Sequence, residues 1–441
     1  MTMRLRWLTA KDRPVIQALA WFVVGVATAL LLFSLRAIVF PPADVEPGEL
    51  VVLSGADDSV GAQRQRLIDD WNYSHPANPA RLESLSSEAD RQHSEMVARA
   101  QSGQSGVDVY NLDVTWIAEF AAAHFIRPLD DSTSTAGFLD KPLSTCRFDG
   151  RLWALPFNTD AALLFYRTDL VSAGALPRQL PPSEADLRQL KAGTVRAGYV
   201  GQLGHYEGLT VNALEAIWAA GGDVIDGDRV VIDSPKAQAA LQQLARGMVA
   251  GRDLPPAVLP DSTTFTEKSS TDAFRSGAVA YMRNWPVAYG QLKSSQDTGG
   301  GFDIARNFAV APLPGPSVLG GQNLAISSDT SKPRAAQALI EFLTSESSER
   351  RLFGEGGLAA TRAATYADES VRARRPYADT LLAAVRDARP RPLTTHYGLF
   401  TSVFQDVLSQ ALAPGRPPAE RGKLPDDAVS RLTSALNGRL R

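Results

Sequence analysis

Carboxylates recur beside aromatic or amide side chains at the predicted ends of strands. The residues at these positions are Asp57, Asp58, Asp113, Trp116, Asp160, Asn284 and Trp285. A carboxylate accepts hydrogen bonds from hydroxyl groups, and the face of an indole ring packs against the C–H face of a sugar ring. Each aspartate could instead cap the following helix, and each tryptophan could belong to the core. The joint recurrence of both residue types favours a carbohydrate-binding site.

Asp160 is the most informative of these carboxylates. It lies in "PFNTDAALLFYRTDLV" (156–171), between a proline-led polar turn and an apolar run that predicts a buried strand. An unpaired charge beside a buried strand costs several kcal/mol, so we expect Asp160 to have a partner. In open α/β sheets, ligands bind beyond the carboxyl ends of strands, where these side chains could converge on one cleft.

Strand and helix patterns alternate along the chain. Strands are predicted at 50–55, 81–86, 107–113, 161–166, 278–284, 308–313 and 323–328. Helices are predicted at 59–71, 88–100, 115–125, 234–251, 330–345 and 425–440, and the chain is largely helical from Leu343 onward. Ser234 and Ser331 are predicted helix caps, each close to a proline at the start of its helix. This alternation predicts an α/β fold with mostly parallel sheets.

The length and charge of the chain restrict its class. A chain of 441 residues is too long for one ordinary core, so two or more lobes are expected. The formal net charge is −3, and the first 40 residues carry +4, which leaves −7 on the remainder. A mildly acidic body argues against nucleic acid as the main partner. The single cysteine, Cys146, excludes a disulfide within the chain and is expected to be a small buried residue.

The N-terminus contains an apolar segment long enough to cross a membrane. Residues 15–35 are 21 uncharged residues, preceded by four basic ones. About 20 apolar residues span a bilayer as a helix, and the basic residues place the N-terminus in the cytoplasm. We therefore expect a cytoplasmic segment at 1–14, an uncleaved anchor in the cell membrane at 15–40, a linker at 41–48 and an extracellular body. A cleaved signal peptide is the competing interpretation.

Signals for catalysis and for metal binding are weak. No nucleophile elbow, zinc-binding HExxH, phosphate-binding loop or dinucleotide fingerprint occurs, and the five histidines are scattered. The acidic stretch "DVIDGDRVVID" (223–233) lacks the alternating carboxylates of a calcium loop and favours a hairpin turn. A hydrolase that uses Asp113 and Asp160 as an acid–base pair is an alternative. We predict binding without catalysis, with no catalytic residue, metal or cofactor.

Five stretches in a fixed order resemble a known family. They are "GVDVYNLDVTWIAEFAAAHFIRPLDD" (106–131), "GRLWALPFNTDAALLFYRTDLV" (150–171), "YEGLTVNALEAIWAAGGDVID" (206–226), "GAVAYMRNWPVAYGQL" (277–292) and "GGQNLAISSDTSKPRAAQALIEFLTS" (320–345). Over residues 49–436 the chain resembles the family 1 extracellular solute-binding proteins of ABC importers, in particular the maltose- and trehalose-binding group. The resemblance implies a two-lobed fold like that of type II periplasmic binding proteins.

The resemblance also implies lobe boundaries and partners. One lobe would comprise 49–156 with about 286–330, and the other 160–283 with about 333–441. "PFNTDA" would cross between the lobes and "MRNWP" would return. The implied function is capture of a disaccharide or oligosaccharide by a monomer that delivers it to ABC permease subunits. A ligand sensor or scavenger of the same fold, acting through another membrane partner, is the alternative.

Several site residues follow from the resemblance. Asp160 would lie at the hinge and accept hydrogen bonds from sugar hydroxyls, and Asp113 would be the acidic contact of the first lobe. Trp285 matches the aromatic platform, and Asp57 or Asp58 matches a polar contact after the first strand. The last two matches are Arg391, at the place of a basic sugar contact, and Gln322, at a position that is usually aromatic.

Overall fold

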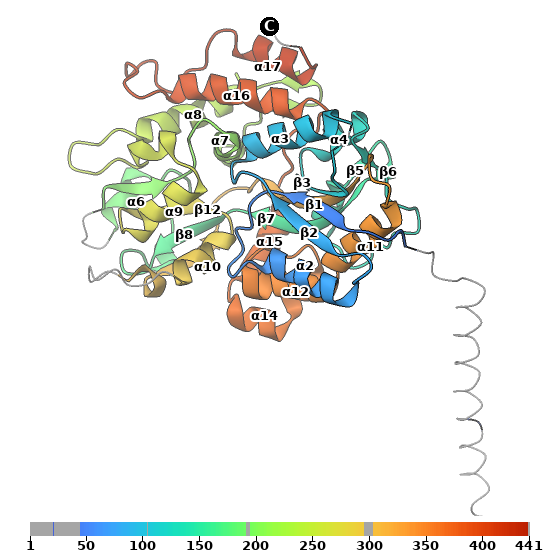
Figure 1. Cartoon of the computed structure of the whole chain (residues 1–441). Helices are drawn as coiled ribbons and strands as arrows, with labels where there is room; N and C mark the ends of the chain where they lie inside the picture. The colour runs from blue at the N-terminus through green and yellow to red at the C-terminus, as the bar shows by residue number, and fades with distance from the viewer. Residues whose placement is uncertain (1–20, 22–44, 104, 191–194, 295–302, 440–441) are drawn as a thin grey trace, which may run out of the picture. The chain divides into compact units, whose positions relative to one another are not determined.

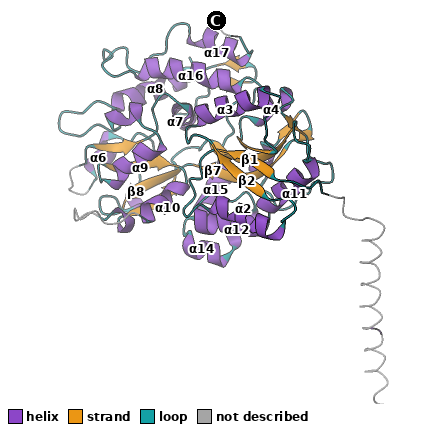
Figure 2. Cartoon of the chain, in the orientation of Figure 1, coloured by secondary structure: helices purple, strands orange, loops and turns teal. Residues whose placement is uncertain are grey.

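The computed structural model describes residue 21 and residues 45–103, 105–190, 195–294 and 303–439. The predicted anchor at 15–40 and the predicted cytoplasmic segment at 1–14 lie outside the described residues, except for Trp21. Within the described ranges, no helix has both the length and the apolar character needed to span a bilayer. Pro47–Arg441 form one compact unit, in which helices cover two larger β-sheets (Figures 1 and 2).

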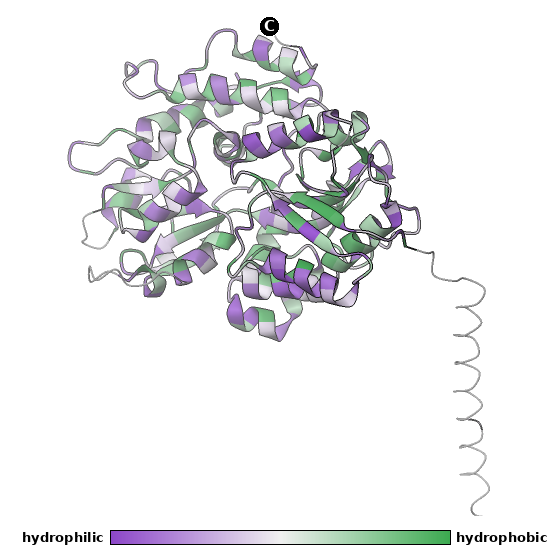
Figure 3. Cartoon of the chain, viewed as in Figure 1, coloured by the Kyte–Doolittle hydropathy of each residue, from purple (hydrophilic) through white to green (hydrophobic). Residues whose placement is uncertain are grey.

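The first sheet has six strands. They are β1 (Leu50–Ser54), β2 (Ala80–Ser84), β3 (Val109–Asp113), β4 (Ile126–Arg127), β7 (Ala154–Ala161) and β14 (Leu319–Ser327). β1 is parallel to β2 and β3, whereas β14 is antiparallel to β3, β4 and β7. Successive side chains face opposite sides of a strand, so Val52 and Leu53 belong to different hydrophobic cores. Figure 3 shows the hydrophobic character of β1.

The second sheet has four strands, in the order β13-β8-β12-β9. They are β8 (Leu163–Arg167), β9 (Ala197–Val200), β12 (Val279–Asn284) and β13 (Phe308–Pro312). Only Ala162 separates β7 of the first sheet from β8 of the second, so the chain passes between the sheets at this residue. The predicted two-lobed α/β fold is thereby confirmed, and the first crossing lies beside Asp160 as the resemblance implied.

Helices cover both sheets and form most of the C-terminal third. They are α2 (Gln63–Ser74), α3 (Ala89–Gln101), α4 (Ile117–Ala122), α5 (Asp140–Ser144), α6 (Glu184–Arg188), α7 (Glu207–Ala219), α8 (Pro235–Gly247), α9 (Glu267–Arg275), α10 (Val287–Lys293), α11 (Pro333–Leu343), α12 (Glu346–Arg351), α13 (Ala363–Ala367), α14 (Glu369–Arg374), α15 (Ala378–Asp387), α16 (Tyr397–Leu412) and α17 (Ala428–Leu436). A short hairpin, β10 (Ile225–Asp226) with β11 (Arg229–Val230), confirms that the acidic stretch at 223–233 turns. Cys146 is buried, as predicted.

Two local predictions are wrong. "PFNTDA" is the end of strand β7 rather than a polar turn, because its backbone pairs with β14. Lys332, not Ser331, precedes α11. Ser234 is the N-cap residue of α8, as predicted, although its side chain makes no capping hydrogen bond. In both helices a proline occupies the first position, where its fixed φ favours the helix and one backbone N–H needs no partner.

The return to the first sheet comes later than predicted. After the "MRNWP" segment the chain enters α10 and β13, and β13 pairs with β8 of the second sheet. The chain rejoins the first sheet only at β14, so residues 286–330 are divided between the two sheets. Residues 333–441 are also divided, since α11 packs against β7 and β14 of the first sheet. An apolar strand pattern shows that a segment is a strand, but it does not show which sheet the strand joins.

Candidate functional site

A cleft of about 700 Å³ lies between residues at the ends of the two sheets. Sites for small molecules usually have volumes of about 300–1,000 Å³. Eight of the nine predicted site residues line this cleft. They are Asp58, Asp113, Trp116, Asp160, Asn284, Trp285, Gln322 and Arg391. Residues that are more than 330 positions apart in sequence therefore meet in one place, and Asp57 is the exception.

The strand register of the first sheet arranges one wall of the cleft. Asp113 at the end of β3 lies opposite Gln322 of β14, and Gln322 lies opposite Asn158 of β7. Asp160, two residues after Asn158, is on the same side of β7 and lies opposite Gly320. A Cβ atom on Gly320 would lie 3.3 Å from the Cβ of Asp160, so the glycine leaves room beside this carboxylate.

Arg64 is a buried cation that the sequence analysis did not identify. Its Nη2 donates to Oε1 of Gln322 at 2.6 Å. Its Nη1 donates to the carbonyl of Ala56 at 3.3 Å and to the hydroxyl of Ser54 at 3.4 Å. Within the described part of the chain, Nε of Arg64 has no hydrogen-bond partner. Gln322, at the usually aromatic position, therefore holds a guanidinium group against the cleft wall.

The carboxylates near Arg64 are held in an unfavourable environment for charge. Burial raises the pKa of Asp160 to about 7, although Arg64 and a hydrogen bond from Asn158 at 3.2 Å oppose this effect. Burial also raises the pKa of Asp58, again opposed by Arg64 and increased by Glu267. Groups that hydrogen-bond to these carboxylates would stabilise their charged form. The cleft therefore favours a ligand that donates hydrogen bonds.

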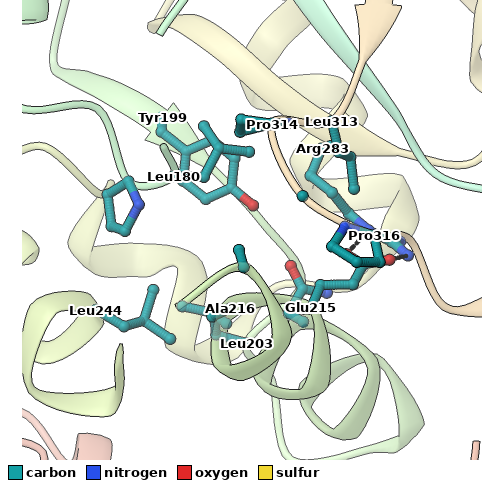
Figure 4. A pocket seen from close by; sticks show the side chains of 14 residues that line it. Leu180, Tyr199, Leu203, Glu215, Ala216, Leu244, Arg283, Leu313, Pro314 and Pro316 are labelled. Atoms are coloured by element: carbon teal, nitrogen blue, oxygen red, sulfur yellow. Dashed lines mark hydrogen bonds and ion pairs between the residues drawn. The ribbon is translucent and has the colours of Figure 1, made fainter. Parts of the chain in front are cut away.

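Trp285 lines the cleft and is fixed on several sides. The guanidinium carbon of Arg283 lies 3.9 Å from the centre of the indole ring. Arg283 is buried and held by both oxygens of Glu215 at 2.8 Å (Figure 4). The indole Nε1 donates to Oε1 of Glu267 at 3.3 Å, and Oε2 of Glu267 accepts a hydrogen bond from the hydroxyl of Tyr206 at 2.8 Å. These contacts fix the orientation of the ring.

Arg391 joins two parts of the cleft wall. Its Nη2 donates to Asp113 of β3 at 2.8 Å, and its Nη1 donates to Glu207 at the start of α7 at 2.7 Å. Glu207 also accepts hydrogen bonds from the hydroxyls of Tyr397 at 2.5 Å and Thr401 at 2.6 Å. β3 belongs to the first sheet. α7 belongs with the second sheet, because its Glu215 pairs with Arg283 of β12. Arg391 is therefore an ionic link between the two lobes.

Two of the predicted site residues, Asp57 and Asn284, hold neighbouring parts of the backbone in place through hydrogen bonds. The carboxylate of Asp57 accepts hydrogen bonds from the backbone N–H groups of Ser59 at 3.1 Å and Arg64 at 3.0 Å, so it organises the start of α2. Asn284 is 1% exposed, and its amide donates to the hydroxyl of Thr271 at 2.9 Å while its carbonyl accepts from the backbone of Trp285 at 2.8 Å. Asn284 therefore positions the loop that carries the indole ring.

Trp116 lines the cleft but is mostly buried. Its ring centre lies 5.2 Å from the ring centre of His93, and Nε2 of His93 is hydrogen-bonded to Glu119 at 2.7 Å. The aromatic surface that Trp116 presents to the cleft is therefore smaller than the prediction from sequence implied.

A second pocket adjoins Arg283 and Glu215. It has a volume of about 40 Å³ and is lined mainly by apolar side chains, including Leu203, Leu244 and Leu313 (Figure 4). A water molecule occupies roughly 10–15 Å³ on this measure, so this pocket holds a few waters at most. It is a packing gap beside a buried ion pair rather than a ligand site.

Several polar residues of the cleft were missed from sequence, and five of them make the contacts described above. They are Arg64, Asn158, Tyr206, Glu207 and Glu267. Arg64 precedes Leu67, Ile68 and Trp71 at helical spacing on the buried face of α2, and a cation on such a face is a detectable signal. Glu207 likewise opens a helix, α7, whose residues are almost all buried.

Comparisons with known proteins agree with this architecture. The sequence profile of the bacterial extracellular solute-binding protein family matches residues 55–350. A "Probable ABC transporter-binding protein" of Deinococcus radiodurans is 30% identical over 394 residues, which are 83% of this chain and 90% of that protein.

Two solved structures share the fold. Maltose-bound T. maritima MalE3 is 28% identical, with a TM-score of 0.77 over 88% of this chain and 99% of that one. UgpB from Mycobacterium tuberculosis, in complex with glycerophosphocholine, is 22% identical, with a TM-score of 0.71 over 89% of this chain and 99% of that one.

The family consists of proteins that bind small solutes rather than of enzymes, and it works with ABC permeases. The profile covers two thirds of the sequence, and the two-lobed fold with a cleft between the lobes agrees with it. The chain belongs to the bacterial extracellular solute-binding protein family.

Proposed function

We propose that this protein captures a carbohydrate, a disaccharide or short oligosaccharide, in the cleft between its lobes and delivers it to the permease of an ABC importer. The observation that supports this proposal best is the set of polar groups around one aromatic ring. Asp58 and Asp160 can accept hydrogen bonds from hydroxyls, and Nε of Arg64 can donate one. A sugar hydroxyl both donates and accepts, so it suits such a mixed wall.

Trp285 would provide the surface for the sugar ring. Arg283 covers one face of the indole, which leaves the opposite face as the one available to a ligand. The fixed ring would lose little freedom on binding, because Glu267 and Asn284 already hold it in place. MalE3, which is 28% identical to this chain, is bound to maltose, and this agrees with the proposal.

We also propose that residues 15–40 tether the body to the outer face of the cell membrane. Their uncharged sequence, the four basic residues before them and the proline-rich linker after them support this arrangement. Extraction of membranes with alkaline carbonate tests the tether. The full chain should stay in the membrane pellet, whereas a peripheral protein would be released.

A thermal-shift screen of the full-length protein tests solute capture. The panel contains mono- and disaccharides, polyols, glycerophosphodiesters and polyamines. A ligand at about 100 times its Kd adds roughly 2.7 kcal/mol to the free energy of unfolding, which raises Tm by several degrees at most. Stabilisation by one sugar class supports the proposal. Stabilisation by polyamines alone would contradict it.

A further inference from the structure

The charges that line the cleft are unbalanced. Seven carboxylates and four cationic side chains line it, which is an excess of three negative charges. The carboxylates are Asp58, Glu88, Asp113, Asp160, Glu207, Glu267 and Asp272, and the cations are Arg64, Lys268, Arg275 and Arg391. The net charge of a site affects which ligands enter it, because a desolvated cleft increases the energy of each charge–charge interaction.

Three of the four cations are already neutralised by carboxylates. Arg391 lies between two of them, as described above. Lys268 and Arg275 both pair with Asp272, at 2.7 Å and 2.5 Å. An incoming anion would therefore have to compete with an existing carboxylate for each of these cations.

Arg64 is the one cation of the cleft without a carboxylate within 4 Å in the described part of the chain. Three of its five N–H groups donate to neutral acceptors, on Ser54, Ala56 and Gln322, and Nε has no partner among the described residues. Asp58 and Asp160 also stabilise its positive charge from nearby. Arg64 can donate to a ligand hydroxyl, and its positive charge is already partly compensated by these carboxylates.

The unpaired groups of the inner wall are mainly acceptors. Asp58, Asp160 and Glu267 form no ion pair within the described residues. Asn158 is 3% exposed and lines the cleft; its Nδ2 donates to Asp160, and its Oδ1 has no partner among the described residues. A buried acceptor without a donor destabilises the folded protein. This independent feature also requires a ligand that donates hydrogen bonds.

We propose that the cleft selects a polyhydroxy ligand that carries no negative charge and accepts a protonated amino group beside Asp160 and Asn158. An ammonium group has three donors and no acceptor, which matches two adjacent acceptors, the carboxylate of Asp160 and the donor-free Oδ1 of Asn158. The hydroxyls of the same ligand would accept from Nε of Arg64. The inference rests on the proposed function, and it names amino sugars as the ligand class that this cleft binds best.

Titration calorimetry with matched probes tests this charge preference on the full-length protein. The probes are glucose, 6-amino-6-deoxyglucose and glucose 6-phosphate, and trehalose, 6-amino-6-deoxytrehalose and trehalose 6-phosphate. We expect each phosphate to bind on the order of 100-fold more weakly than its parent, the factor for two unit charges roughly 6 Å apart at an effective dielectric constant of about 20. At least one amino sugar should bind about 10-fold more tightly than its parent.

Two variants that each remove one negative charge distinguish the effect of a charge in the cleft from the effect of the net charge of the protein. Asp160→Asn removes one unpaired carboxylate and should reduce both the amino preference and the phosphate penalty about 10-fold. Asp69→Asn, on the exposed face of α2, should leave both ratios unchanged. Ratios between probes do not depend on the stability of the variant. If Asp160→Asn and Asp69→Asn give equal ratios, the inference is wrong.

The outcomes distinguish this inference from the function on which it rests. Tighter binding of the phosphates than of the parent sugars would overturn the charge preference and leave solute capture intact. Equal affinity for the parent, amino and phosphate forms would also overturn it. Absence of binding by all six probes, together with no stabilisation in the sugar screen, would overturn both.

Discussion

Replacing Arg391 with methionine removes the ionic link between the two lobes while keeping most of the volume of the side chain. In the wild type the side chain of Arg391 is 3% exposed and lies between Asp113 and Glu207. The variant leaves two carboxylates near each other without their shared cation. Breaking a buried ion pair by removing one partner costs about 3–5 kcal/mol, because the remaining charge is uncompensated.

The surroundings of Glu207 place the expected cost near the lower end of this range. The hydroxyls of Tyr397 and Thr401 still donate to its carboxylate in the variant. Burial already raises the pKa of Glu207, and loss of Arg391 raises it further, so protonation relieves part of the cost. We expect a loss of about 3 kcal/mol at pH 7.5 and a smaller loss at pH 5. The double variant Arg391→Met/Glu207→Gln should recover part of the loss.

Guanidinium chloride unfolding of the ligand-free protein measures these differences. Arg389→Met is the matched control, because Arg389 lies two residues away and pairs with Asp223 at 2.6 Å on a more exposed surface. Exposed pairs contribute about 0–1 kcal/mol. Equal losses for Arg389→Met and Arg391→Met would refute the buried link. A double variant less stable than Arg391→Met alone would refute the argument that an uncompensated Glu207 causes the loss.

Substitutions at three further positions test the cleft and the contacts that support it. A carboxyl whose pKa is raised in the folded state costs stability as pH rises from about 4 to about 7. Asp160→Asn should therefore stabilise the ligand-free protein by about 2 kcal/mol at pH 8 and by little at pH 4, measured by chemical unfolding. Equal effects at both pH values would contradict this. Asp57→Ala should cost about 1–2 kcal/mol through loss of the bonds that organise α2, and Asp57→Asn clearly less, by the same measurement; equal losses would exclude the capping role. Gln322→Leu should cost about 1–3 kcal/mol in thermal unfolding, because Arg64 and Asn111 both lose an acceptor. Gln322→Glu should retain most of the stability. If Gln322→Leu does not change the stability, the Arg64 contact is unimportant.

Most strands and helices were predictable because their patterns are local. Short, mainly apolar runs predicted β1, β3 and β12, and the helical spacing of Leu67, Ile68 and Trp71 predicted α2. The strand to which a segment pairs depends on distant residues, so the sequence did not place β13 in the second sheet. "PFNTDA" was mistaken for a turn because it is polar, and it is polar because Asn158 and Asp160 of this strand line a cleft.

The candidate site was predictable as a group but not residue by residue. Carboxylates and tryptophans at strand ends pointed to the correct cleft, since the ends of neighbouring strands meet. Position alone did not separate Asp58, which lines the cleft, from Asp57, which caps a helix. Arg64 was missed because its role depends on Gln322, 258 positions away, which only the folded chain brings within hydrogen-bond distance.

The most direct test of solute capture is calorimetric titration of the stabilising sugar from the screen into wild type, Asp160→Ala and Trp285→Ala. Both residues line the cleft, and both are partly exposed. We predict that each variant folds with a circular dichroism spectrum like that of the wild type and binds the sugar at least about 100-fold more weakly, a loss of about 2.7 kcal/mol. Wild-type affinity in both variants would place the binding site outside this cleft.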